Sequence, residues 1–309
     1  MLSEMVGRRT FERLSEAFDA FQLYARIEGR SGKTLEVYQV AFQDLLRFLG
    51  EDRALTDIGA SDIRRWIAYK LDSGYSKTTV NIRLRALRAF FNWLVREGYL
   101  SESPCAHVRQ LRTPRQYPYV LSEQQVTALL KGIKRDGWTG KRNWAMVLTM
   151  LDAMLRLSEL IHLELADVNL QARSIRVRHG KGDKERVVFM GKRLTRAMHD
   201  WLSVRGHFVG SDWVFVTRQG SKLDGRNVER ILERYAAKAK LTDVRVSPHT
   251  LRHTGATLFI RNGGDPFALQ RLLGHSDIST TMIYVHMAGA ALREAHAKAS
   301  PVDRLLEGF

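Results

Sequence analysis

The chain has 309 residues, 44% of them hydrophobic and 27% charged, which is enough for two folded domains. Its 49 Lys and Arg residues outnumber 33 Asp and Glu residues, and the formal net charge of +16 indicates a polyanionic partner, most often nucleic acid. A single cysteine, Cys105, excludes an internal disulfide and a cysteine-rich metal site, and no signal peptide or bilayer-spanning run is evident, so we expect a cytoplasmic protein without membrane contact.

The first hundred residues contain only helical patterns. Apolar residues recur at helical spacing over 11–27 and 35–49, and glycines end both stretches. Two more helices are expected at 62–71, capped by Ser61, and at 77–97, capped by Ser76. The connections are short, which predicts a small all-α bundle.

The helix at 77–97 has a polar stripe opposite its apolar stripe. The polar positions are Thr78, Asn81, Arg85, Arg88 and Asn92. Such a stripe is most often a solvated face, and it becomes a candidate DNA-binding face only if the rest of the chain indicates an enzyme that acts on DNA.

Residues 101–118 read as the connector between two domains. They hold half of the six prolines, which prevent the stretch from joining either neighbouring helix. Arg112 and Arg115 are candidate phosphate contacts there, the alternative being a solvated linker. We expect a first domain at 1–112, a linker at 113–118 and a second domain at 119–309.

The second domain combines helices with a hairpin. Helical patterns are followed by two alternating segments, 174–178 and 185–189, which predict strands joined by a tight turn. We expect helices at 122–133, 141–154, 158–164, 192–204 and 224–240, and a further short strand at 213–216. The fold class is therefore mainly α with a small β-hairpin or sheet (α+β).

Several candidate functional residues, two histidines, an arginine and a tyrosine, lie close together near the end of the chain. Pro248 after Ser247 predicts a helix start, which places His249 and Arg252, three residues apart, on one face of its first turns. His275 follows a glycine, and Tyr284 lies nine residues further on. Each residue by itself could be an ordinary polar group at a helix end, but helix starts and arginines both attract phosphate.

Two upstream motifs add to this set. Arg156 is followed three residues later by Glu159. The alternative to a catalytic role is that the two residues form an ordinary ion pair at a helix end. Lys181 lies between two glycines in the predicted hairpin turn, and its alternatives are a solvated turn lysine or a role for the neighbouring Lys184.

Together these motifs resemble those of the tyrosine recombinase (phage integrase) family. The matching segments are Leu-Arg-Leu-Ser-Glu-Leu at 155–160, the lysine hairpin at 180–186, His-x-x-Arg at 249–252, Gly-His at 274–275 and the tyrosine at 284. Residues 78–93 are similar to a DNA-clamping helix of that family. One departure is Met154, where the family has glycine; if that glycine has a positive φ, methionine is strained there.

The resemblance implies metal-independent DNA cleavage without a cofactor. The implied catalytic residues are Arg156, Lys181, His249, Arg252, His275 and Tyr284, with Glu159 as a support. Tyr284 would attack a phosphodiester and form a 3′-phosphotyrosyl link, with its proton taken by His249 and its phenolate favoured by nearby cations. The arginines and histidines would bind the negative transition state, and Lys181 would protonate the departing 5′ oxygen.

The resemblance also implies partners. A helical N-terminal core-binding domain would clamp double-stranded DNA carrying an inverted-repeat core site, and a homo-tetramer would form on the DNA through a C-terminal helix at 289–298 and tail at 301–309. Accessory proteins and association with the nucleoid would fit this assignment. Two alternatives share the same residues: a nicking-closing enzyme of the type IB topoisomerase kind, and a DNA-binding regulator that lacks catalysis.

Overall fold

The computed structural model describes residues 11–114, 117–178, 185–206, 208, 210–289, 300 and 302. The chain divides into two compact units, Met1–Arg115 and Gln116–Phe309. The division falls inside the stretch 113–118 that was expected to be the linker. Each unit has its own hydrophobic core.

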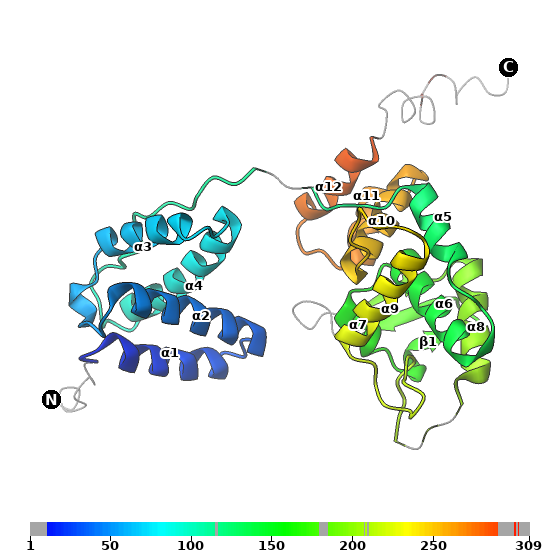
Figure 1. Ribbon diagram of the computed structural model, residues 1–309, viewed down its shortest axis with the longest axis horizontal. Helices are drawn as coiled ribbons and strands as arrows, with labels where there is room; N and C mark the ends of the chain where they lie inside the picture. The colour runs from blue at the N-terminus through cyan, green and yellow to red at the C-terminus, as the bar shows by residue number, and fades with distance from the viewer. Residues whose placement is uncertain are drawn as a thin grey trace. The chain divides into compact units, whose positions relative to one another are not determined.

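The described part of the first unit is a helical bundle, as predicted (Figure 1). Its α-helices are α1 (Leu14–Ile27), α2 (Gly32–Leu49), α3 (Ala60–Asp72) and α4 (Lys77–Arg96), with a 3₁₀ turn η1 (Leu55–Asp57). Aromatic rings fill the core, where Phe18 stacks on Phe42 and both meet the edge of Phe90. Ser76 caps α4 as expected, but α3 begins after Gly59, so the predicted cap at Ser61 is wrong.

The polar stripe of α4 is only partly exposed. Asn81 is 7% exposed, and its side chain donates to the Leu111 carbonyl and accepts from the Leu111 amide. Arg88 is half-buried and donates to the Val108 carbonyl. The prediction of an exposed, DNA-facing side chain is therefore wrong for Asn81, because this amide satisfies buried backbone groups. The exposed members are Thr78, Arg85 and Asn92.

The same contacts correct the extent of the linker. Cys105 and Val108 are buried in the core of the bundle, with Leu111 packed against it. The stretch 101–111 thus belongs to the first unit, and the interpretation of all of 101–118 as a free connector is wrong.

The second unit is built around helix α6 (Gly137–Asp152), which packs against α8 (Lys192–Arg205) on one side and α10 (Pro248–Arg261) on another (Figure 1). The remaining helices are α5 (Glu123–Lys131), α7 (Leu157–Ile161), α9 (Gly225–Lys238), α11 (Pro266–Leu273) and α12 (Ser279–Ala288), with a 3₁₀ turn η2 (Leu165–Asp167). Ser122 and Gln125 form a capping box at the start of α5. No described helix is long and apolar enough to cross a membrane.

A small antiparallel sheet lies beside these helices. Its order is β1 (Val168–Asn169), β2 (Ser174–Val177), β3 (Arg186–Phe189), and Ile175 pairs with Val188 at its buried face. The predicted hairpin strands are confirmed, while β1 is too short to leave a periodic pattern. The expected strand at 213–216 is wrong: the described chain there makes only isolated bridges, Glu164 with Trp213 and Val216 with Lys222.

Candidate active site

The turn between α6 and α7 places Arg156. Met154 has a φ of 53°, so this turn uses the left-handed region that glycine would adopt freely. Arg156 is the N-cap residue of α7, and its amide donates to Glu159 Oε2 at 2.7 Å. The strain expected at Met154 is therefore present, and its buried side chain packs in the cluster that contains Tyr284.

We expect Met154→Gly to destabilise the protein by about 1–3 kcal/mol. Relief of the left-handed strain is worth about 1–2 kcal/mol, whereas loss of a buried methionine side chain costs about 2–5 kcal/mol. Urea unfolding of both proteins measures the difference. Met154→Ala is the matched control, since it loses the side chain and keeps the strain, and it should be less stable than either. A glycine variant more stable than the parent protein would show that strain dominates.

Glu159 is the centre of a cluster of arginines. Its carboxylate accepts from Arg156 Nη1 at 2.8 Å and from both Nη atoms of Arg186 at 2.8 Å, and Arg252 Nη1 lies 3.7 Å away. Burial alone would raise the pKa of Glu159, but the hydrogen bonds and charge of Arg186 and the hydrogen bonds of Arg156 lower it to about 2. The carboxylate stays ionised and holds the guanidinium groups in place.

Arg252 is fixed by backbone carbonyls. It projects from α10, donates through Nη1 to Met154 at 2.6 Å and through Nη2 to Leu273 at 2.7 Å, and is 4% exposed. Gly255, one turn later, allows α10 to approach α6, because a Cβ there would collide with the Leu151 carbonyl. Burial, together with the neighbouring Arg156, lowers the pKa of Arg252 to about 10, so it remains a cation at neutral pH.

Arg186 is a member of the site that the sequence analysis did not assign. It lies on β3, donates through Nε to the Leu272 carbonyl at 2.8 Å, and its side chain is 9% exposed. Gly274 lies against its side chain in a left-handed conformation, with φ of 64°, at the end of α11. The residue was present in the hairpin motif, but nothing in the pattern says that it pairs with Glu159.

Tyr284, on α12, is 3% exposed and contacts a histidine. His253 Nδ1 lies 2.8 Å from its hydroxyl, whereas the expected partner, His249, is exposed and has no hydrogen bond to Tyr284. Burial raises the pKa of the Tyr284 phenol and outweighs the lowering by Arg252 and Arg156. The two arginines thus act in the expected direction, toward the phenolate, but burial has the larger effect in this structure. His253 follows His249 by four residues, a spacing that could have indicated it.

His275 is held beside Tyr284. Its Nδ1 lies 3.0 Å from Thr281 Oγ1, and its ring is 6.4 Å from that of Tyr284 between centroids. Burial, with the nearby Arg252, lowers the pKa of His275 to about 4, and burial with His249 lowers that of His253 to about 4. Both rings are thus neutral at pH 7 and can each donate one hydrogen bond and accept another.

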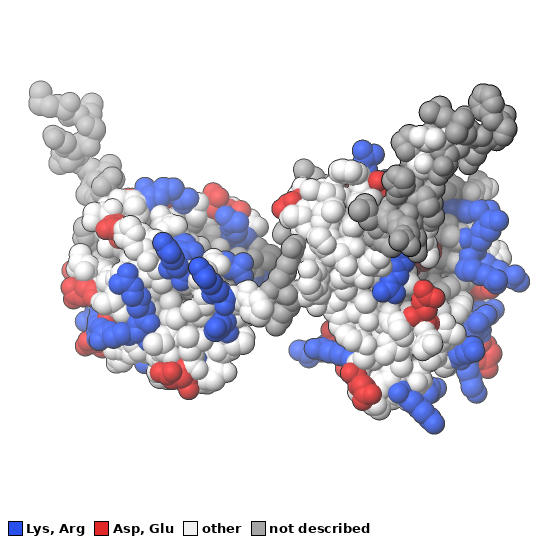
Figure 2. All heavy atoms as spheres, turned by 90° about the horizontal axis from the view of Figure 1, so that it is seen from above, with Lys and Arg blue, Asp and Glu red and all other residues white. Residues whose placement is uncertain are grey.

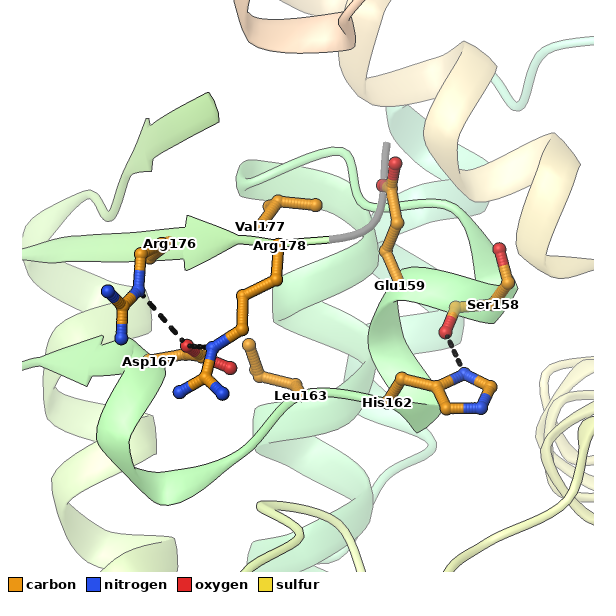
Figure 3. Close-up of a pocket in the computed structure, with 8 residues that line it drawn as sticks. All are labelled: Ser158, Glu159, His162, Leu163, Asp167, Arg176, Val177 and Arg178. Atoms are coloured by element: carbon orange, nitrogen blue, oxygen red, sulfur yellow. Dashed lines mark hydrogen bonds and ion pairs between the residues drawn. The ribbon is translucent and has the colours of Figure 1, made fainter. Parts of the chain in front are cut away.

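A small pocket next to Glu159 shows how the strand leading to the hairpin turn is anchored (Figure 3). Asp167 accepts from Arg176 Nε at 3.3 Å and from Arg178 Nε at 2.5 Å. The Lys181 prediction, like its rival Lys184, lies outside the described residues, as does Arg115.

The arrangement suits binding of an oxyanion. Three guanidinium groups, those of Arg156, Arg186 and Arg252, surround one carboxylate, so positive charge is in excess. Arg156 keeps 24% of its side chain exposed, and its Nη2 makes only a 3.5 Å contact with the Gly274 carbonyl. Tyr284 lines a pocket of about 460 Å³ together with His253. His275 stacks beside the phenol, and the charges of Arg252 and Arg156 act on it. The described residues hold no cluster of His, Cys, Asp or Glu that fits a metal ion.

Two family patterns match the chain. Residues 119–290 match the Phage integrase family, and residues 18–98 match the Phage integrase N-terminal SAM-like domain.

Curated relatives are similar over nearly their full length. The chain is 34% identical to tyrosine recombinase XerD of Shewanella oneidensis, covering 89% of this chain and 92% of that one. It is 36% identical to tyrosine recombinase XerA of Thermococcus kodakarensis, covering 94% and 98%.

Solved structures share the fold. A crystal structure of XerA recombinase has a TM-score of 0.53 and 30% identity, over 93% of this chain and 99% of the other. The Tn1549 transposon integrase in complex with a circular intermediate DNA has a TM-score of 0.72 and 20% identity, over 92% and 98%.

Proposed function

Because the chain belongs to the phage integrase family of tyrosine recombinases and is a site-specific DNA recombinase, we propose that Tyr284 is its nucleophile and forms a 3′-phosphotyrosyl intermediate. The observation that carries the assignment is that Tyr284 lies beside His275 and within the influence of the charges of Arg156 and Arg252, the two arginines that lie against Glu159. Attack by the phenol oxygen on phosphorus breaks the bond to the 5′ oxygen and adds negative charge that the arginines stabilise.

The histidines have different parts in this proposal. His253 accepts the phenol hydrogen bond at Nδ1 when its own proton is on Nε2, so it is placed to receive the proton of Tyr284. His275, oriented by Thr281, donates to a non-bridging oxygen, and His249 supplies a further donor from the exposed side of α10. Since Tyr284 is 3% exposed, attack requires that the phenol become more exposed when DNA binds.

Lys181 is the general acid in this proposal. Lys181→Ala should block cleavage of normal DNA, because the 5′ oxygen is a poor leaving group without a proton. A substrate with sulfur in place of that oxygen should restore cleavage, since a thiolate leaves unprotonated. Lys184→Ala is the matched control and should cleave both substrates normally. If sulfur fails to rescue Lys181→Ala, or rescues Lys184→Ala instead, the acid is another residue.

DNA contacts of the first unit are also part of the proposal. Figure 2 shows Lys and Arg side chains spread over one face of that unit, with Asp and Glu toward its edges. Thr78, Arg85 and Asn92 of α4, together with Arg112, are exposed and available to a duplex. Their chemistry suits phosphate and base-edge contacts.

The proposal also covers how the protein assembles on DNA. A DNA-bound XerH recombinase and the Tn1549 integrase–DNA complexes share this fold. We infer a homo-tetramer on an inverted-repeat core site, joined through the C-terminal helix and tail at 289–309, which lie almost wholly outside the described residues. We also propose that the protein associates with the nucleoid in the cytoplasm and that accessory proteins take part. The comparisons give no support to the topoisomerase and inactive-regulator alternatives.

A further inference from the structure

A groove runs between α6 and α8 of the second unit, with a volume of about 660 Å³. One wall is a face of α6 and the other a face of α8, and Leu130 of α5 and Arg135 contribute at one side. The lining residues are Leu130, Arg135, Lys141, Trp144, Leu148, Arg193, Arg196, Ala197 and Asp200.

The groove is strongly cationic. Four of its side chains are cations, those of Arg135, Lys141, Arg193 and Arg196, and Asp200 is its one carboxylate. No ion pair joins any of the four to another described residue, whereas buried arginines of the same unit, such as Arg186, are paired or bonded to carbonyls. Unpaired cations gathered in one concavity attract an anionic ligand.

The floor of the groove is apolar. Trp144 and Leu148 of α6 face Ala197 of α8, and Trp144 is half-buried. The guanidinium of Arg135 lies 4.2 Å from the centre of the Trp144 ring, which holds this cation at the rim. The groove thus offers an aromatic and aliphatic surface surrounded by positive charge.

The groove lies away from the candidate active site. In Figure 1, α8 forms the right margin of the second unit, while α7 and α12 lie on its other side. Figure 2 shows Lys and Arg side chains along that same right margin. The catalytic cluster around Glu159 therefore does not use these cations, and none of them lines the pocket of Tyr284.

We propose that this groove binds an acidic segment of a partner protein, with carboxylates on the four cations and an apolar side chain on Trp144 and Leu148. The cationic rim is complementary to the carboxylates of an amphipathic acidic segment, and the apolar floor is complementary to its apolar side chains. The backbone of a DNA duplex offers phosphates to the cations but no apolar group to the floor. The proposal does not depend on the catalytic assignments.

The test uses the full chain and a labelled synthetic peptide of about twelve residues, in which Glu alternates with Leu and Phe, followed by fluorescence anisotropy. The double variant Arg193→Gln/Arg196→Gln should bind it roughly tenfold more weakly, because two of the four charge contacts are lost. The matched control is Arg226→Gln/Arg230→Gln on α9, which removes the same charge from another exposed face and should bind as the parent protein does.

A second measurement tests the floor without altering the protein. A peptide whose Leu and Phe residues are replaced by Ser keeps every carboxylate, and it should bind the parent protein several-fold more weakly. Equal binding of both peptides, or equal loss in the two double variants, would mean nonspecific attraction to a basic protein and would overturn the proposal. If Arg193→Gln/Arg196→Gln instead lowers affinity for a DNA duplex and leaves peptide binding unchanged, the groove is a DNA contact and the proposal fails.

Discussion

Tyr284→Phe is expected to abolish covalent attachment to DNA while leaving DNA affinity within about twofold of the parent protein. The change removes one oxygen, and the ring keeps its place in the cluster with Met154 and Leu269. The lost hydrogen bond to the neutral His253 should cost only about 0.5–1.5 kcal/mol of stability. Labelled DNA that stays bound to protein under denaturing conditions measures the adduct, and gel shift measures affinity.

Tyr235→Phe is a well-matched control for this experiment. Tyr235 is also a buried tyrosine of the second unit, 8% exposed, and its hydroxyl accepts from Asn143 Nδ2 at 3.0 Å. Its variant should form adducts at the normal rate. If Tyr284→Phe still forms adducts, the nucleophile is another residue. The function proposed for this pocket would then be wrong.

Arg252→Lys should slow DNA cleavage on the order of 10²–10³-fold, although the positive charge is kept. The guanidinium is fixed by two carbonyls, those of Met154 and Leu273, which leaves its remaining N–H groups in a defined orientation. An ammonium cannot bridge both carbonyls and also present paired donors to a phosphate. Single-turnover cleavage of a suicide substrate measures the effect on the chemical step.

The same substitution at Arg261 provides the comparison. Arg261 is exposed at the end of the same helix, and Arg261→Lys should cleave at the parent rate. In Arg252→Lys, one carbonyl loses its partner at a cost of about 1–3 kcal/mol, so a melting curve is needed to confirm that the variant is folded. Cleavage by folded Arg252→Lys at the parent rate would exclude a transition-state role for the guanidinium.

The local sequence determined most of the helices and the beginnings of three of them. Ser76, Ser122 and Ser247 cap α4, α5 and α10 because a side-chain oxygen can satisfy a free amide two or three residues later whatever the rest of the fold does. The hairpin strands followed from their alternation, and the motifs around Arg156, His249 and Tyr284 were sufficient to identify the family. Strain at Met154 was expected only from the resemblance, because the family has glycine at this position and a glycine with a positive φ cannot be replaced without strain.

Only the tertiary structure decided which polar groups meet. Asn81 looked like part of an exposed stripe, but a segment thirty residues away folds back and uses its amide to satisfy Leu111. Arg186 pairs with Glu159 because β3 passes beside α7, and His253 contacts Tyr284 because α12 packs on α10. Local pattern gives the spacing of side chains along one element. Their partners depend on which elements the cores bring together, and no local pattern contains that information.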